Sequence, residues 1–145
     1  MIAVTEGWTG MLAGAMVYDS LVIVPARRAV PIDDQLEGWR EYFSRAKSFF
    51  QAVGMALLGP MGYCLYQSGF APLWAAAIAP VLLVGPYTAL FIKPHNDMLE
   101  SKRGDELSPA ALSAAMSKWA RRHHVRTAMF LFSYACIFAQ THLVL

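Results

Sequence analysis

The sequence predicts an all-α fold, an integral membrane four-helix bundle with amphipathic cytoplasmic extensions of helices two and four. First, 57% of the 145 residues are hydrophobic and only 15% are charged, against roughly 25% charged residues in a typical soluble domain. Second, four stretches are almost uncharged, each close to the ~20 residues with which a helix crosses the hydrocarbon core. They are residues 7–25, 49–68, 72–92 and 127–145. Third, all 12 Lys and Arg residues lie outside them, between Arg27 and Lys47 or between Lys93 and Arg126.

The same composition excludes several classes of protein. A disordered chain would be far more polar, and a net charge of +2 is too small to favour nucleic acid as a partner. A soluble helical bundle needs a polar stripe along each helix, but Asp19 is the only Asp, Glu, Lys or Arg within the four stretches. We therefore expect residues 1–145 to form a single membrane domain that lies in the lipid bilayer.

The distribution of Lys and Arg predicts the orientation of the chain. The connection 26–48 carries five of these residues and the connection 93–126 carries seven, whereas the turn 69–71 carries none. Four spans place both basic connections on the same side of the membrane. We expect them to face the cytoplasm, with both termini outside, in a plasma or inner membrane.

The individual spans have further features. The first contains Gly10-x-x-x-Gly14, a spacing that lets helices approach closely, either within the chain or in a homo-oligomer. Ahead of the second span, apolar residues recur at helical intervals among charged ones, which predicts an amphipathic interfacial stretch. The third span should end at Lys93-Pro94. Ser108-Pro109 is a favourable helix start, so the fourth helix should begin there and run unbroken into its span.

Asp19 is the first candidate for a functional residue. A carboxylate within the membrane is costly, and intramembrane acids usually face inward and take part in function. The alternative is structural, with Asp19 paired to an arginine such as Arg126 to fix helix packing. The sequence leaves both interpretations open.

Two polar motifs lie where the third span ends and the fourth begins. The run from Lys93 to Leu99 contains the chain's only asparagine, Asn96, and is either a helix stop or part of a site. In Trp119-x-x-x-His123-x-x-Arg126, offsets of four and seven place all three side chains on one helix face. An aromatic ring, an imidazole and a cation could bind a phenolic aromatic there and move its proton. The alternative is contact with lipid headgroups.

A metal site is the other chemistry that such residues allow. The possible ligands are His95, His123, Asp19 and Asp97. No His-x-x-x-His or Glu-x-x-His pair lies on one helix face, so the sequence favours a site without a metal.

Together the two motifs carry a resemblance to a known family. Pro94-x-Asn96-x-x-Leu99, followed by Trp119-x-x-x-His123-x-x-Arg126-Thr127, resembles the anthrone oxygenase family of small four-helix membrane proteins. The Gly-rich first span ending in Pro25 is similar too, and the other spans match chiefly in hydropathy.

The resemblance implies oxygenation without flavin, haem or metal. The substrate would be a lipophilic, anthrone-like phenolic aromatic from the bilayer, and molecular oxygen the co-substrate. His123 or Asp19 would be the base, and Asn96 and Arg126 would donate hydrogen bonds to the oxyanion. The ring would be held by Trp119, Tyr18 and His95.

A function of another class stays open. One intramembrane acid and a proline-bearing third span would also suit a non-enzymatic membrane protein, such as a transporter subunit or an assembly factor. Oxygen consumption with an anthrone distinguishes the two.

Overall fold

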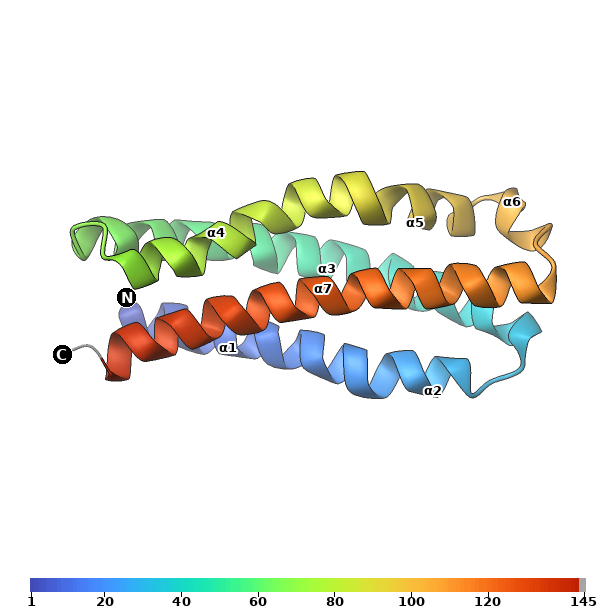
Figure 1. Ribbon diagram of the computed structural model, residues 1–145, viewed down its shortest axis with the longest axis horizontal. Coiled ribbons are helices and arrows are strands. Elements are labelled where there is room, and N and C mark those ends of the chain that lie inside the picture. The colour runs from blue at the N-terminus through green and yellow to red at the C-terminus, as the bar shows by residue number, and fades with distance from the viewer. Residues whose placement is uncertain (144–145) are drawn as a thin grey trace.

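The computed structural model describes residues 1–143, apart from the side chains of Asp33, Lys102 and Arg103. Over that range the protein is all-helical, as predicted, and forms four antiparallel rods (Figure 1). The last two residues of the fourth predicted span, 144–145, lie outside the described residues.

Each rod is one helix or a continuous stack of helices. The first rod consists of α1 (Ile2–Tyr18), the π-helical segment η1 (Asp19–Ile23) and α2 (Val24–Arg28). The second rod is α3 (Ile32–Gln67). The third consists of α4 (Pro72–Tyr87), the π-helical segment η2 (Thr88–Ile92) and α5 (Lys93–Glu100), and the short α6 (Lys102–Asp105) follows it. The fourth is α7 (Pro109–His142).

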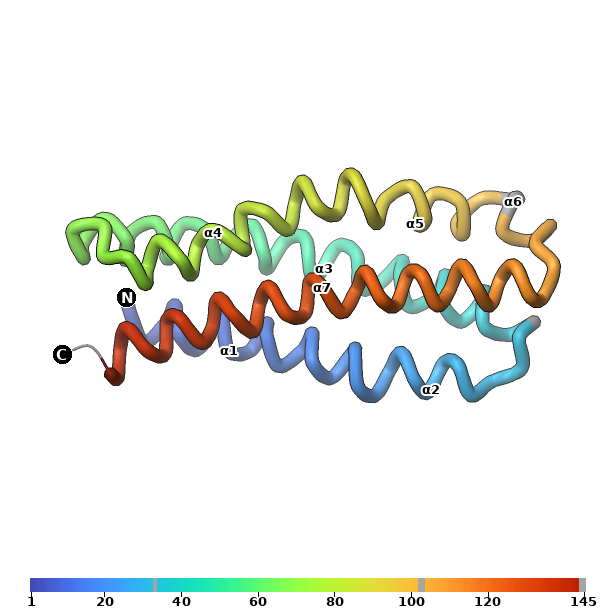
Figure 2. The backbone as a smooth tube through the Cα atoms, viewed as in Figure 1, coloured from blue at the N-terminus to red at the C-terminus, as the bar shows by residue number. Residues whose placement is uncertain are grey.

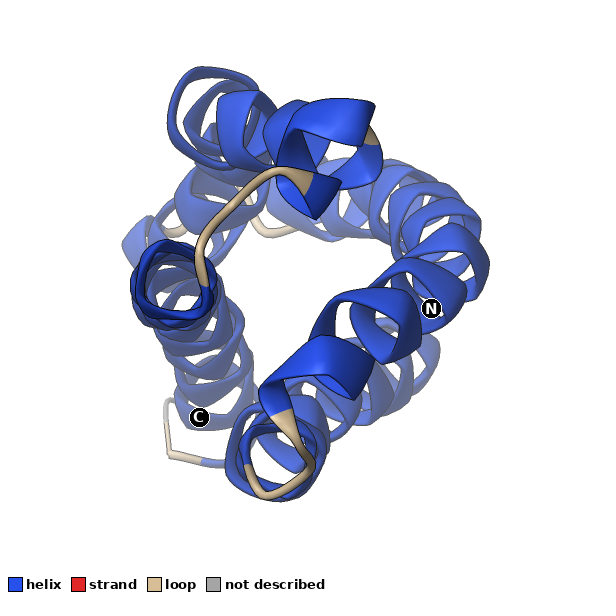
Figure 3. Ribbon diagram, turned by 90° about the vertical axis from the view of Figure 1, so that its right-hand side faces the viewer, coloured by secondary structure: helices blue, strands red, loops and turns tan. Residues whose placement is uncertain are grey.

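The rods stand at the corners of an up-down bundle when it is viewed along their length (Figure 3). The start of α1 and the end of α7 lie at the same end of the bundle, which we call the terminal end (Figure 2). The connections 29–31 and 101–108 lie at the opposite end, which we call the loop end. The two basic connections therefore share one end, as four spans require, and the side of the membrane that this end faces stays a prediction.

Three of the rods are long and apolar enough to cross a membrane: Ile2–Arg28, Asp34–Gln67 and Pro72–Glu100. The predicted extensions of helices two and four are confirmed, because α3 and α7 both begin at the loop end, well before their apolar spans. The Ser108 hydroxyl caps α7 by accepting a hydrogen bond from the backbone N–H of Ala111.

The third helix does not stop at Lys93-Pro94, which excludes the helix-stop interpretation of this run, and the first helix likewise continues past Pro25. A proline ring clashes with the carbonyl four residues earlier and supplies no N–H. Here each proline stands just after a π turn, which adds one residue and absorbs the misfit. The backbone N–H of Val24 reaches back to Asp19, and that of Lys93 reaches back to Thr88.

Two separate apolar clusters hold the bundle together. The first lies in the terminal half and consists of Leu12, Ala13, Met16, Leu57, Met61, Cys64, Trp74, Ala77, Val81, Phe130, Cys136 and Ile137. The second lies at the loop end and consists of Val24, Leu36, Trp39, Ile92, Leu99, Leu112, Met116, Trp119 and Ala120. Gly10 packs on the ring of Tyr134, since an added Cβ would lie 3.0 Å from it. That contact gives the glycine of the first span a role within the chain.

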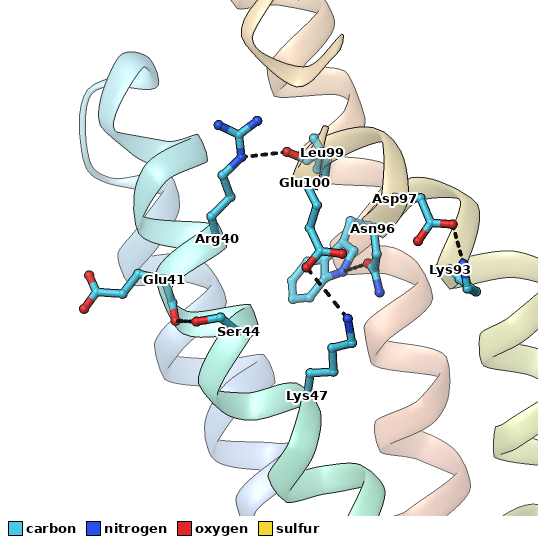
Figure 4. Close-up of polar contacts among 10 residues, drawn as sticks. Arg40, Glu41, Ser44, Lys47, Lys93, Asn96, Asp97, Leu99 and Glu100 are labelled. Carbon is cyan, nitrogen blue, oxygen red and sulfur yellow. Dashed lines mark hydrogen bonds and ion pairs between the residues drawn. The ribbon is translucent and has the colours of Figure 1, made fainter. Parts of the chain in front are cut away.

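Arg40 of α3 fixes the end of the third rod at the loop end. Its guanidinium donates to the backbone carbonyls of Leu99 at 2.8 Å and Ser101 at 2.9 Å, and it pairs with Asp105 at 2.7 Å. Figure 4 shows the first of these bonds. Gly104 is packed so tightly here that a Cβ would lie 2.9 Å from the Leu99 carbonyl oxygen. The loop end is thus closed by directed hydrogen bonds as well as by the second cluster.

Candidate active site

Asp19, His123 and Arg126 form a buried line across the first and fourth rods. His123 Nε2 lies 2.9 Å from Asp19 Oδ2, and these two side chains are only 2% and 4% exposed. On its other side, His123 Nδ1 lies 2.8 Å from the Arg126 guanidinium. The next residues on each rod join the rods beside this line, because the hydroxyls of Ser20 and Thr127 are 2.7 Å apart. The structure thus brings Asp19 of the first rod together with the α7 motif.

The contacts of His123 determine its tautomer. A guanidinium can only donate, so His123 Nδ1 must accept the hydrogen bond from Arg126. The remaining ring proton is then on Nε2, which faces Asp19 as a donor. The imidazole is thereby neutral, with Nδ1 hydrogen-bonded to Arg126 and Nε2–H close to Asp19 without a hydrogen bond of good geometry.

The carboxylate of Asp19 has oxygen lone pairs that accept no hydrogen bond, unlike the ring of His123. Neither Oδ1 nor Oδ2 has a hydrogen-bond partner among the described residues, because the ring N–H of His123, although Nε2 lies 2.9 Å from Oδ2, does not point squarely at it. Buried carboxylates are normally well supplied with donors. This one therefore favours a ligand that brings a proton of its own.

Trp119 joins the third rod to this line. Its ring stacks on His123, with centroids 5.3 Å apart and planes 12° from parallel. Its indole N–H donates to Asn96 Oδ1 at 3.0 Å (Figure 4). Because indole can only donate, the oxygen of the Asn96 amide faces Trp119, and the NH₂ group is left as a donor for a ligand.

All five of these side chains, Asp19, Asn96, Trp119, His123 and Arg126, line one cavity of about 440 Å³. Its volume falls within the roughly 300–1,000 Å³ of pockets that hold small molecules. The rest of the cavity is mainly apolar, and the side chains there include Met16, Phe43, Phe50, Leu58, Val81 and Phe130. The site is thus a mainly apolar cavity whose polar side chains lie at one end.

A comparison with family models identifies the chain. The model described as anthrone oxygenase matches residues 39–136. The chain belongs to the anthrone oxygenase family. Searches of curated proteins and of solved structures find no match to it. The matched range contains the cavity residues of the second, third and fourth rods, while Asp19 lies before it.

Two residues predicted to hold the ring do not line the cavity of this anthrone oxygenase family member. Tyr18 is 58% exposed on the outside of the first rod, and His95 also lies outside the cavity. Each is the chain neighbour of a true cavity residue, Asp19 or Asn96. Consecutive helical residues point about 100° apart, so one neighbour faces the cavity and the other turns away.

Tyr42 and Phe43 are cavity residues whose role the sequence did not predict. Both belong to the amphipathic stretch of α3, where aromatic residues are typical of the membrane interface. The ring of Phe43 stacks on Trp39 at 4.8 Å, and the guanidinium of Arg27 lies 4.0 Å above the ring of Tyr42. Their helical spacing from the buried Trp39, at offsets of three and four, is the signal that could have found them.

The possible metal ligands are not gathered into one group. Over the described residues, no three His, Cys, Asp or Glu side chains lie close enough together to hold a metal ion. Asp97 pairs with Lys93 at the edge of the cavity (Figure 4), and His95 lies outside it.

Proposed function

We propose that this protein is a membrane-embedded oxygenase that converts an anthrone-like phenolic aromatic to a quinone with O₂ and without a cofactor. One observation carries the proposal. The buried Asp19 carboxylate, with a free acceptor oxygen, lies at the polar end of an otherwise apolar cavity. Such a site suits a flat, lipophilic molecule that has one acidic C–H and one oxygen-bearing edge.

The chemistry requires little more than proton removal. The methylene of an anthrone is acidic because its carbanion is delocalised over two rings and a conjugated carbonyl. The resulting anion passes one electron to O₂, and the two radicals combine at the methylene carbon to give a peroxide anion. After protonation, loss of water leaves the quinone. One oxygen atom enters the product, the other leaves in water, and the substrate supplies all the electrons.

Asp19 is the base in this proposal, and His123 holds it in place. A base needs a free lone pair facing the substrate. His123 Nδ1 accepts from Arg126 and Nε2 then carries the ring proton, so the neutral imidazole has no free lone pair, whereas both carboxylate oxygens of Asp19 lack a hydrogen-bond partner among the described residues. The amide NH₂ of Asn96 and the Arg126 guanidinium are donors beside the same cavity, where they can stabilise the developing oxyanion. Trp119 provides a flat wall for the rings.

The direct test is oxygen uptake by the purified protein in detergent with emodin anthrone, corrected for spontaneous oxidation. We expect one O₂ consumed per quinone formed, at a rate proportional to protein. The Asp19→Asn variant, purified in the same way, is the control for a contaminating oxidase. A wild-type rate no higher than spontaneous oxidation in detergent without protein would reject the proposal and favour a non-enzymatic role.

A further inference from the structure

The cavity has an opening in the side of the bundle, between α3 and the third rod. Several of its lining residues are also exposed, which places them at an edge of the cavity. They form two stripes with a spacing of four residues. On α3 the stripe is Lys47, Gln51 and Met55, and on the third rod it is Gly85, Ala89 and Lys93. We call the opening between these stripes the window.

The window lies where the two rods fail to pack. No residue of α3 between Trp39 and Leu57 is buried, and none of the third rod between Val81 and Ile92 is buried. The first apolar cluster joins these rods on the terminal side of the gap, and the second joins them on the loop side. The two clusters thus hold α3 and the third rod together on both sides of the gap. The position of the gap is therefore fixed by the packing of the clusters.

Two glycines line the cavity at this gap, one on each rod. Gly54 of α3 and Gly85 of α4 both line the cavity, and a Cβ added to either would meet no atom within 4 Å. Gly10 and Gly104 differ, because packing leaves no free room for a Cβ there. Other glycines, among them Gly14 and Gly59, also have room for a Cβ, but of the described glycines only Gly54 and Gly85 line this cavity as well.

The two ends of the window differ in polarity. Gly54 and Gly85 lie inside the predicted spans 49–68 and 72–92, at the depth of the hydrocarbon. At the loop end, Lys47 of α3 pairs with Glu100 of α5 at 3.9 Å, as Figure 4 shows. A water-soluble molecule that approaches from the loop end therefore meets the charged side chains of Lys47 and Glu100. A lipophilic molecule in the bilayer meets the part of the window at Gly54 and Gly85, which no side chain fills.

We propose that the substrate enters edge-on from the hydrocarbon layer through the window, and that Gly54 and Gly85 determine the size of ring system it admits. The occupant is an uncharged, flat aromatic of fused rings whose oxygen-bearing edge reaches Asn96 and Arg126. This inference rests on the proposed function for the identity of the substrate. The position of the window rests on packing alone.

The first test fills the window. Gly54→Phe and Gly85→Phe place a ring in the gap, and Gly59→Phe is the matched control, because Gly59 of α3 has equal room but does not line the cavity. Binding of emodin, the quinone product, is followed by quenching of tryptophan fluorescence. We expect a Kd about tenfold or more higher for each window variant, which corresponds to 1.4 kcal/mol, and an unchanged value for the control. Wild-type Kd values in both window variants would overturn the proposal.

The second test asks which phase the window faces. Ala89→Cys, in vesicles, should react with a lipid-soluble maleimide and not with a charged one, and bound emodin should slow the reaction. The parent protein, whose Cys64 and Cys136 are buried, gives the background. Equal reaction with the charged reagent would refute entry from the bilayer. Protection by emodin in a protein that does not oxidise anthrone would refute the proposed function alone and leave the window in place.

Discussion

Replacing Asp19 and His123 separately identifies the base. If Asp19 takes the proton, Asp19→Asn keeps the shape of the side chain but should lower kcat/KM by about 10²–10⁴-fold, the usual worth of a positioned base. At 1.36 kcal/mol per factor of ten, this is about 2.7–5.4 kcal/mol of transition-state stabilisation.

His123→Gln should be much milder. The glutamine carbonyl can accept from Arg126 as Nδ1 does, and its NH₂ group can take the place of Nε2–H beside Asp19. What the variant loses is the stacking on Trp119, whose planes lie 12° apart. Such contacts are worth about 0.5–1.5 kcal/mol, so we expect a loss of about 2–13-fold in kcat/KM.

Initial rates of oxygen uptake, measured over a range of anthrone concentrations, give kcat/KM for each variant. Thermal unfolding in the same detergent checks that both variants fold. The pH–rate profile of His123→Gln should keep the wild-type shape, because in this scheme no imidazole titrates during turnover. A nearly inactive His123→Gln beside a mildly impaired Asp19→Asn would refute the reasoning and make His123 the base.

Further outcomes follow from other contacts. Trp119→Phe removes the donor to the buried oxygen of Asn96, so the free energy of unfolding in denaturant should fall by about 1–3 kcal/mol. Gly104→Ala places a methyl 2.9 Å from the Leu99 carbonyl oxygen. We expect a lower melting temperature, corresponding to about 1–3 kcal/mol, with Gly59→Ala as a control that does not fall. A cysteine added at either chain end should react with a charged maleimide outside intact cells, and labelling only after lysis would reverse the predicted orientation. Chelators should leave the oxygenation rate unchanged, and a rate restored by added copper or iron would instead require a metal.

Hydropathy and charge were enough to predict the bundle, because a membrane allows few alternatives to apolar helices. Polarity was enough to find Asp19 and His123, since a buried polar side chain must meet a partner. The direction of neighbouring side chains was not predictable in the same way. Tyr18 points outward and Asp19 inward, at the junction of an α-helix with a π turn. A sequence gives no direct signal for such a turn, so the phase of the helix beyond it is unknown.

The two π turns make the number of residues between a cavity residue and a proline a condition for two continuous rods. Asp19 opens the first π turn and Thr88 opens the second, each six residues before a proline, and both residues line the cavity. A π turn holds one residue more than the α-helix around it. Deleting a single residue from 20–23 would replace the π turn by an α turn, and the helices on either side would keep nearly the same phase, because the π turn already absorbs the extra residue. Pro25 would then clash with the carbonyl four residues before it, at a cost of about 3 kcal/mol. Loss of one codon, without any substitution, would thereby bend or destabilise the first rod next to Asp19. The number of residues in these turns is thus as much a part of the site as the side chains themselves.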